Sequence, residues 1–223
     1  MLVNRRQSVV DMCYRTKVGD SNMINIFRYF SVFILSLTLF SCAGGGGEVK
    51  HDAVVSYEKK TISHLDIDSD VEDDFKSAIV LMQQDKNAEA VTVLKTVIER
   101  EQRLPAPYVN IAIAYNRLGD TSAAEENLIS ALKLDIGHPV ANNELGLLYR
   151  KSGKFNAART AYENAIKEHP EYLPAIRNLG VLCDLYMHDY QCALQQFEDY
   201  LELKPDDKSV AIWVVDVKRR LVK

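Results

Sequence analysis

The chain has 223 residues, and its 31 Asp and Glu side chains outnumber 27 Lys and Arg, for a formal net charge of −4. This acidic balance argues against a nucleic-acid-binding protein, which needs a basic face. The sequence lacks the glycine-rich phosphate-binding motifs, the HExxH zinc motif and the GxSxG nucleophile motif, and its five histidines show no metal-ligand spacing. We therefore predict no catalytic residues, no metal, no cofactor, no small-molecule substrate and no enzymatic activity.

An uncharged, mostly apolar run of twelve residues, 29–40, follows a single basic residue, Arg28. It is too short to cross a bilayer, which takes about 20 residues, but it suits the hydrophobic part of a secretory signal. The run ends in Leu39-Phe40-Ser41-Cys42, which resembles the lipobox of bacterial lipoproteins. In that family the cysteine is lipidated and becomes the new N-terminus, so the resemblance implies lipidation of Cys42. The alternative is a buried helix with an incidental cysteine, which the four glycines at 44–47 would interrupt.

These features divide the first 70 residues into three predicted segments. Residues 1–22 are an upstream extension, with Met23 as the expected true start, and residues 23–41 are a lipoprotein signal peptide. Residues 42–70 are a lipidated N-terminus and a flexible tether. Loss of residues 1–41 leaves 22 basic and 29 acidic side chains, a net charge of −7. The acidic residues between 66 and 74 are expected to complement the dipole of the first repeat helix rather than to bind a metal.

Ala43 follows the cysteine, in place of the aspartate that keeps lipoproteins of enteric bacteria at the inner membrane. We therefore expect a lipid anchor in the outer membrane of a bacterial envelope, with the rest of the chain in the periplasm.

From residue 71 the sequence repeats with a period of 34 residues, in units at 71–104, 105–138, 139–172 and 173–207. When Pro139 is counted as position 1, small residues recur at positions 8, 20 and 27, and large apolar residues at positions 11 and 24. In the third unit these are Gly146, Ala158, Ala165, Tyr149 and Tyr162. The second half of the fourth unit arrives one residue late, at Ala193, Phe197 and Tyr200.

Each unit contains two stretches of helical periodicity with a turn between them, in which Gly153 of the third unit suits a left-handed conformation. Residues 208–223 follow as a final amphipathic helix. Its expected apolar face consists of Val210, Ile212, Trp213, Val217 and Leu221. The 34-residue pattern resembles the tetratricopeptide repeat family. The resemblance implies an all-α fold, a right-handed superhelix (α-solenoid) of four helix pairs with a C-terminal capping helix.

The resemblance also implies where a partner binds, because positions 2, 5, 9, 12 and 13 of the first helices line a concave groove in this family. Position 9 is apolar in all four units and is expected to form the groove floor: Ile79, Ile113, Leu147 and Val181. Position 5 holds Phe75, Val109, Asn143 and Arg177. A basic patch is expected from Arg117, Arg150, Lys151 and Arg177, set side by side. Such a groove suits an amphipathic helix or an extended segment with acidic residues rather than a terminal carboxylate. In the alternative, the position-9 side chains only pack within the superhelix.

Two further expectations concern cysteine and histidine. Cys183 and Cys192 both lie in the fourth unit, on helices whose antiparallel packing brings them close, so they form either a disulfide or one buried and one exposed thiol. His138 and His169 precede prolines in the turns between units, where surface positions are expected.

Together these features predict an envelope lipoprotein whose repeats bind another protein. It resembles the pilotin-type lipoproteins of pilus and secretion machines and the repeat lipoproteins that serve as adaptors for cell-wall enzymes. Two alternatives stay open: an accessory of a TonB-type energy-transducing complex, and a cytosolic co-chaperone-like module if the apolar run is not a signal. The pattern does not indicate an oligomeric state.

Overall fold

The computed structural model describes residues 67–222, which belong to one compact unit, Gly46–Lys223. The predicted extension, the signal peptide, Cys42 and most of the tether lie outside the described residues. The described part consists of helices and their connecting turns: α2 (Ser69–Gln83), α3 (Asn87–Arg100), α4 (Pro105–Leu118), α5 (Thr121–Leu134), α6 (Pro139–Lys151), α7 (Phe155–Glu168), α8 (Leu173–Leu182), the π-helical turn η2 (Cys183–Met187), α9 (Tyr190–Leu203) and α10 (Lys208–Leu221).

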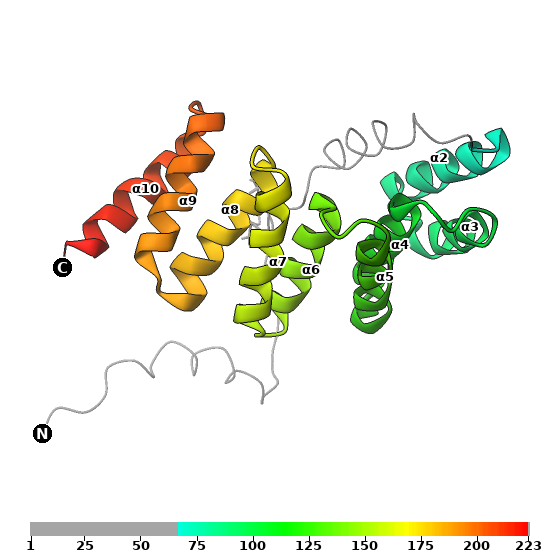
Figure 1. Ribbon diagram of the computed structural model, residues 1–223, viewed down its shortest axis with the longest axis horizontal. Helices are drawn as coiled ribbons and strands as arrows, with labels where there is room; N and C mark the ends of the chain where they lie inside the picture. The colour runs from blue at the N-terminus through cyan, green and yellow to red at the C-terminus, as the bar shows by residue number, and fades with distance from the viewer. Residues whose placement is uncertain (1–66, 223) are drawn as a thin grey trace, which may run out of the picture. The chain divides into compact units, whose positions relative to one another are not determined.

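The helices pack in chain order as four antiparallel pairs, α2/α3, α4/α5, α6/α7 and α8/α9, with α10 against α9 (Figure 1). Each second helix also packs on the first helix of the next pair. The first helices contact one another as well, α2 with α4, α4 with α6 and α6 with α8. The described residues therefore form the predicted all-α solenoid of four pairs and a final helix, in which burial depends on neighbouring pairs.

Packing within each pair depends on the small residue at position 8 and the large residue at position 24. In the third and fourth units position 8 is glycine, and a Cβ atom there would lie 2.5 Å from the ring of Tyr162 (at Gly146) or Phe197 (at Gly180). The first two units have alanine at position 8 and leucine at position 24, and both members of each pair are buried in one cluster: Ala78 with Leu94, and Ala112 with Leu128. Glycine is thus used where the facing side chain is an aromatic ring.

The turn inside each unit contains one residue in the left-handed conformation. In the first three units it stands at position 15, where Asp85 has φ 59°, Gly119 φ 87° and Gly153 φ 75°. In the fourth unit it is His188, at position 16, with φ 54°. The extra residue is absorbed by η2, whose π-helical hydrogen bond joins the His188 N–H to the Cys183 carbonyl. The late arrival of the second helix in the sequence therefore marks a π-helical insertion.

Two expectations about exposure were wrong. His138 is buried rather than at the surface, because it is the N-cap of α6: its Nδ1 accepts a hydrogen bond from the Ala141 N–H at 3.3 Å. Burial lowers the pKa of His138 to about 4. On α10 the buried residues are Val210, Val214 and Val217, whereas Ile212 is largely exposed.

The acidic start of the first unit acts as expected. Asp68 caps α2 by accepting a hydrogen bond from the Asp70 N–H, and Arg100 of α3 makes ion pairs with Asp68 and Asp74 at 3.1 and 3.2 Å. These carboxylates therefore cap and tether a helix.

Candidate partner-binding surface

The four first helices share one face of the solenoid, which we call the first-helix face (α2, α4, α6 and α8). Its position-9 side chains are all half-buried and pack against the hydrophobic core clusters: Ile79, Ile113, Leu147 and Val181. Part of each side chain is therefore buried in the solenoid and part reaches the surface, so packing within the superhelix holds for these residues and their role in a partner-binding groove stays a prediction. They form an apolar row that follows the first helices across the four units.

Most of the position-5 side chains are buried beneath this face rather than exposed on it. Phe75, Val109 and Asn143 are buried, whereas Arg177 is half-buried. Phe75 and Val109 belong to core clusters. The structure therefore assigns these three predicted groove residues to the packing beneath the face rather than to its exposed surface.

Three of the four predicted basic residues lie at the C-terminal ends of first helices, and we call them the basic edge: Arg117, Arg150 and Lys151. Arg117 and Lys151 are exposed, and Arg117 Nη1 donates to the Met82 carbonyl of the preceding unit at 3.1 Å. Arg177 stands seven residues earlier in its unit than Arg150, about 10 Å along a helix. Its charge acts on Tyr200 near the end of α9. Three of the residues therefore share the C-terminal ends of α4 and α6, whereas Arg177 lies near the start of α8, and their side-by-side arrangement stays a prediction.

The π-helical turn adds apolar and aromatic groups next to the basic edge. Leu185 is 60% exposed and Tyr186 43% exposed. The Tyr186 ring lies 5.2 Å from the Phe155 ring, and the Arg150 guanidinium lies 5.5 Å from the Tyr186 ring centroid, a cation–π contact between the third and fourth units. The turn thus presents two large side chains at the surface, one of which, Tyr186, contacts Arg150.

Two ties hold this turn in place. One is an ion pair: the buried Asp184 carboxylate meets the Arg220 guanidinium of α10 at 2.6 Å (Oδ1–Nη1) and 3.1 Å (Oδ2–Nη2). Arg220 also stacks 4.9 Å above the Tyr190 ring. The Oδ2 contact is a charge-assisted hydrogen bond, and the Oδ1 contact adds an ion pair, so the final helix is connected directly to the turn.

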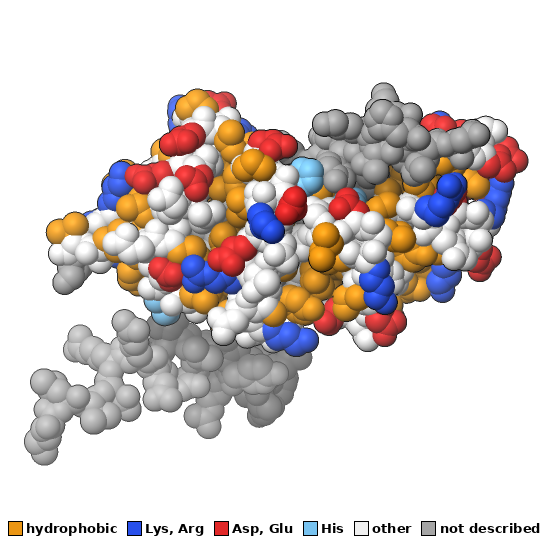
Figure 2. All heavy atoms as spheres, in the orientation of Figure 1, with side chains coloured by type: hydrophobic (Ala, Val, Ile, Leu, Met, Phe, Trp, Pro, Cys, Tyr) orange, Lys and Arg blue, Asp and Glu red, His pale blue; other side chains and the backbone are white. Residues whose placement is uncertain are grey.

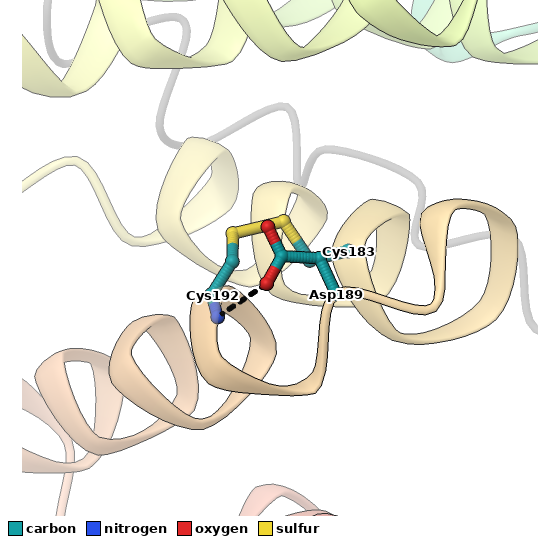
Figure 3. Close-up of side chains that lie close together, drawn as sticks. All are labelled: Cys183, Asp189 and Cys192. Carbon is teal, nitrogen blue, oxygen red and sulfur yellow. Dashed lines mark hydrogen bonds between the residues drawn. A yellow bond between two sulfur atoms is a disulfide. The ribbon is translucent and has the colours of Figure 1, made fainter.

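The second tie is a disulfide between Cys183 and Cys192, with Cα atoms 5.9 Å apart (Figure 3). Asp189 lies beside it as the N-cap of α9, accepting from the Cys192 N–H at 3.1 Å, and its other oxygen accepts from Arg159 of α7 at 3.0 Å. The hydrogen bond from Cys192 and the charge of Arg159 lower the pKa of Asp189. Both ends of the insertion are therefore attached to the solenoid.

Among the described residues, Cys183, Asp189 and Cys192 form the cluster with potential metal-ligand atoms within 4.8 Å of one another. The two sulfur atoms are bonded to each other, and a metal ligand needs a thiolate. With the two cysteines bonded to each other, the cluster therefore serves as a structural cross-link.

A buried polar chain runs under the first-helix face. Asn178 Nδ2 donates to Asn143 Oδ1 at 2.9 Å, and Asn143 Nδ2 donates to Glu144 Oε1 at 3.3 Å. Burial raises the pKa of Glu144 to about 7, although the bond from Asn143 and the charge of Arg117 act against the shift. Near neutral pH this side chain therefore exchanges between an acid and a carboxylate inside the solenoid.

Sequence reasoning missed Tyr186 and the buried position of Glu144. The signal for Tyr186 was present, because the fourth unit is one residue too long between Cys183 and Ala193 and an insertion displaces side chains toward the surface. For Glu144 the signal is weaker: position 6 is polar in every unit (Lys76, Asn110, Glu144 and Asn178), although it lies on a helix face that is otherwise apolar.

Comparison with known families agrees with the repeat geometry. Tetratricopeptide repeat models match residues 106–135 and residues 139–172, which are the second and third helix pairs. The chain is a tetratricopeptide repeat protein. The other two pairs of this repeat protein have the same helix order and the same small–large packing. No curated protein sequence matches the chain.

Solved structures of other repeat proteins are similar to this one. A Pseudomonas aeruginosa PilF structure is 20% identical, with 67% of this chain and 68% of that chain covered and a TM-score of 0.61. MamA from Desulfovibrio magneticus RS-1 is also 20% identical, with 67% and 84% covered and a TM-score of 0.58. TTC0263, a repeat protein from Thermus thermophilus, is 19% identical, with 75% and 90% covered and a TM-score of 0.58. At these identities the likeness establishes the fold.

None of the helices between residues 67 and 222 combines the length and the apolar character that a membrane span requires.

Proposed function

We propose that this repeat protein is a membrane-anchored scaffold that recruits a partner protein through the first-helix face. The observation that carries the proposal is the meeting of three features at one place: the apolar position-9 row, the basic edge, and the exposed Leu185 and Tyr186 on a turn held by a disulfide and an ion pair. Rigid presentation of large side chains beside a half-exposed apolar row is typical of a binding surface rather than of a solvated helix end.

The chemistry of this surface defines the partner class. The apolar row runs along several first helices and matches the spaced apolar residues of an amphipathic helix or an extended segment. Arg150 and Lys151 supply positive charge at one border, so a partner segment with acidic residues is favoured. The tetratricopeptide fold supports a protein partner, and the chain's acidic balance argues against nucleic acid.

We place the scaffold in the bacterial cell envelope, anchored in the outer membrane by a lipid on Cys42 with the repeats in the periplasm. The support is the apolar run that ends in Leu39-Phe40-Ser41-Cys42, followed by Ala43. The partner then belongs to an envelope assembly, such as pilus, secretion or cell-wall machinery. The fold equally suits an accessory of a TonB-type complex, and a cytosolic co-chaperone-like module is the alternative without a signal.

Site-specific photo-crosslinking in cells tests the binding surface. A photoreactive amino acid at Leu147, in the apolar row, should capture a discrete partner, whereas the same group at the exposed Glu126 on α5 should not. Charge reversal by Arg150→Glu with Lys151→Glu should remove the product formed at position 147. Equal capture from both positions, or capture unaffected by the reversal, would place the binding surface elsewhere.

Metabolic labelling tests the anchor separately. The wild-type chain should incorporate labelled palmitate and fractionate with outer membranes, and Cys42→Ala should abolish both. A wild-type protein that takes up no palmitate and stays in the cytosolic fraction would support the co-chaperone-like alternative instead.

A further inference from the structure

The carboxyl group of Glu144 is buried without a basic partner. In the view of Figure 2, acidic side chains lie at the surface, interspersed with basic ones. Among residues 67–222, the buried carboxyl groups are those of Glu101, Glu144 and Asp184. Glu101 pairs with Arg103 and Asp184 pairs with Arg220, in each case at 2.6 Å. Within this part of the chain Glu144 makes no ion pair, which sets it apart from the other two.

Two phenol hydroxyls lie in the electrostatic field of this carboxyl group. They belong to Tyr162 of α7 and to Tyr172, the N-cap residue of α8. Both hydroxyl oxygens are buried, and neither has a hydrogen-bond partner among the described residues. Burial raises the pKa of both phenols, and the charge of Glu144 raises it further. A buried hydroxyl without a partner is uncommon in a folded protein and calls for an explanation.

The remaining ionisable group that acts on Glu144 is Arg117, at the end of α4. Its guanidinium donates to the Met82 carbonyl at 3.1 Å. Helices α5 and α8 also pack on α6, and among the described residues neither adds an ionisable group to this set. The donors left for an ionised Glu144 are therefore the two phenols and the side chain of Asn143, which already donates to it at 3.3 Å.

Of the two phenols, Tyr172 is the one free to turn toward Glu144. The Tyr162 ring is fully buried against Gly146, where an added Cβ atom would lie 2.5 Å from the ring, so close packing fixes its position. Tyr172 is half-buried and packs against the core cluster formed by α4 to α7. Because it stands at the start of α8, its side chain joins the first helix of the fourth unit to the third unit.

Ionisation of Glu144 changes what this carboxyl group requires. A carboxylate only accepts hydrogen bonds, and a buried one is costly unless donors surround it. A hydrogen bond from a hydroxyl to a carboxylate is roughly twice as strong as one between neutral groups. Ionisation should therefore draw the Tyr172 hydroxyl onto Glu144. Since burial raises the pKa of Glu144 to about 7, both protonation states are populated near neutral pH.

We propose that Glu144 and Tyr172 form a proton-controlled latch between the third and fourth repeat units. In the ionised state the Tyr172 hydroxyl donates to the Glu144 carboxylate and ties the start of α8 to α6. In the protonated state this tie is weak, and packing and the hydrogen bond from Asn178 to Asn143 hold the junction. The latch is a property of the solenoid itself and does not depend on the proposed partner.

Chemical denaturation of the purified full-length chain in detergent tests the latch with four proteins: the wild type, Tyr172→Phe, Glu144→Gln and the double variant. At pH 8.5 Tyr172→Phe should lower the folding equilibrium constant about tenfold or more, because it removes a charge-assisted hydrogen bond. At pH 5.5 it should have little effect. In the Glu144→Gln background its effect should be the same at both pH values. The titration of His138 cancels, because it is common to all four proteins.

Two further readouts locate the latch. Carbon-13 NMR follows the Glu144 carboxyl, identified by its absence from Glu144→Gln, and Tyr172→Phe should raise its pKa by removing a donor that stabilises the ionised form. The N–H groups of Ala175 and Ile176 donate to the Tyr172 carbonyl. Their hydrogen exchange, corrected for the intrinsic effect of pH, should be slower at pH 8.5 than at pH 5.5 in the wild type and not in Tyr172→Phe.

Tyr162→Phe is the matched control, because it removes the other buried hydroxyl near Glu144 and leaves the start of α8 unchanged. Its effect on stability should be the same at both pH values. A Tyr172→Phe effect that does not depend on pH overturns the proposal, and so does an unchanged titration of Glu144. A pH-dependent effect found in Tyr162→Phe and not in Tyr172→Phe also overturns it.

Discussion

The third and fourth repeat units pack their helices in the same way but join them differently. Both set a glycine of the first helix against an aromatic ring of the second, Gly146 on Tyr162 and Gly180 on Phe197. The third unit turns at Gly153, in the left-handed conformation that glycine adopts readily. The fourth inserts one residue, turns at His188 and adds a disulfide and an ion pair. The packing of the two helices is therefore common to both units, whereas the turn between them differs from one unit to the other.

Among the features that distinguish the two units, the disulfide should have the largest effect on the free energy of unfolding. Cys183→Ala with Cys192→Ala should lower the free energy of unfolding by about 2–3 kcal/mol, because the bond closes a short loop in the unfolded chain. Chemical denaturation followed by circular dichroism measures the loss. Reductant should bring the wild type to the stability of the double variant and leave the variant itself unchanged. Free thiols in the unfolded, unreduced wild type would show that the bond does not form.

A second difference lies at position 6, where the third unit has Glu144 and the fourth has Asn178. Because burial raises the pKa of Glu144 from 4.5 to about 7, the folded protein keeps a proton that the unfolded chain has lost in that range. The contribution of Glu144 to the free energy of unfolding therefore falls as pH rises from 4.5 to 7. Above pH 7 the folded protein bears the full cost of a buried, ionised carboxylate. Glu144→Gln, which keeps a neutral side chain, should stabilise the protein by about 2 kcal/mol at pH 8.

The pH profile of the Glu144→Gln variant gives the internal control. Burial lowers the pKa of His138 from 6.5 to about 4, so the unfolded chain binds a proton first and stability falls as pH drops from 6.5 to 4. The two residues act in opposite directions over much of this range. The variant should therefore lose stability on acidification more steeply than the wild type. Parallel profiles for the two proteins would mean that Glu144 is already ionised in the fold.

The shared glycine–aromatic packing has a smaller net effect. Gly180→Ala should lower the free energy of unfolding by about 1–2 kcal/mol, because the clash with Phe197 exceeds the gain in helix propensity. Adding Phe197→Leu should recover much of the loss, since the Ala–Leu pairing of Ala112 and Leu128 is native to the second unit. A double variant no more stable than Gly180→Ala would show that the two pairings are not interchangeable.

The solenoid was predictable because its pattern is local and repeated. Gly146 and Tyr162 lie in one unit, and the same positions recur 34 residues away, so each unit supports the interpretation of the others. His138 and Ile212 were placed wrongly because their exposure depends on a cap geometry and on helix rotation, which hydrophobic spacing does not contain. Glu144 was missed because its environment is built by residues of three units, with Arg117 and Asn178 both contributing.

The variant with the smallest expected effect on stability, Tyr186→Ala, separates the role of the inserted turn in stability from its role in binding. Tyr186 is partly exposed and contacts Arg150 and Phe155, both of the third unit. Tyr186→Ala should cost only about 0.5–1 kcal/mol of unfolding free energy, as expected for an exposed cation–π contact and one aromatic pair. If the turn exists to present this ring, the same variant should nevertheless lose most of the partner captured by a photoreactive group at Leu147. Tyr186→Phe keeps the ring and should retain both stability and capture. Capture that survives Tyr186→Ala at wild-type level would confine the turn to a structural role and leave binding to the apolar row and the basic edge.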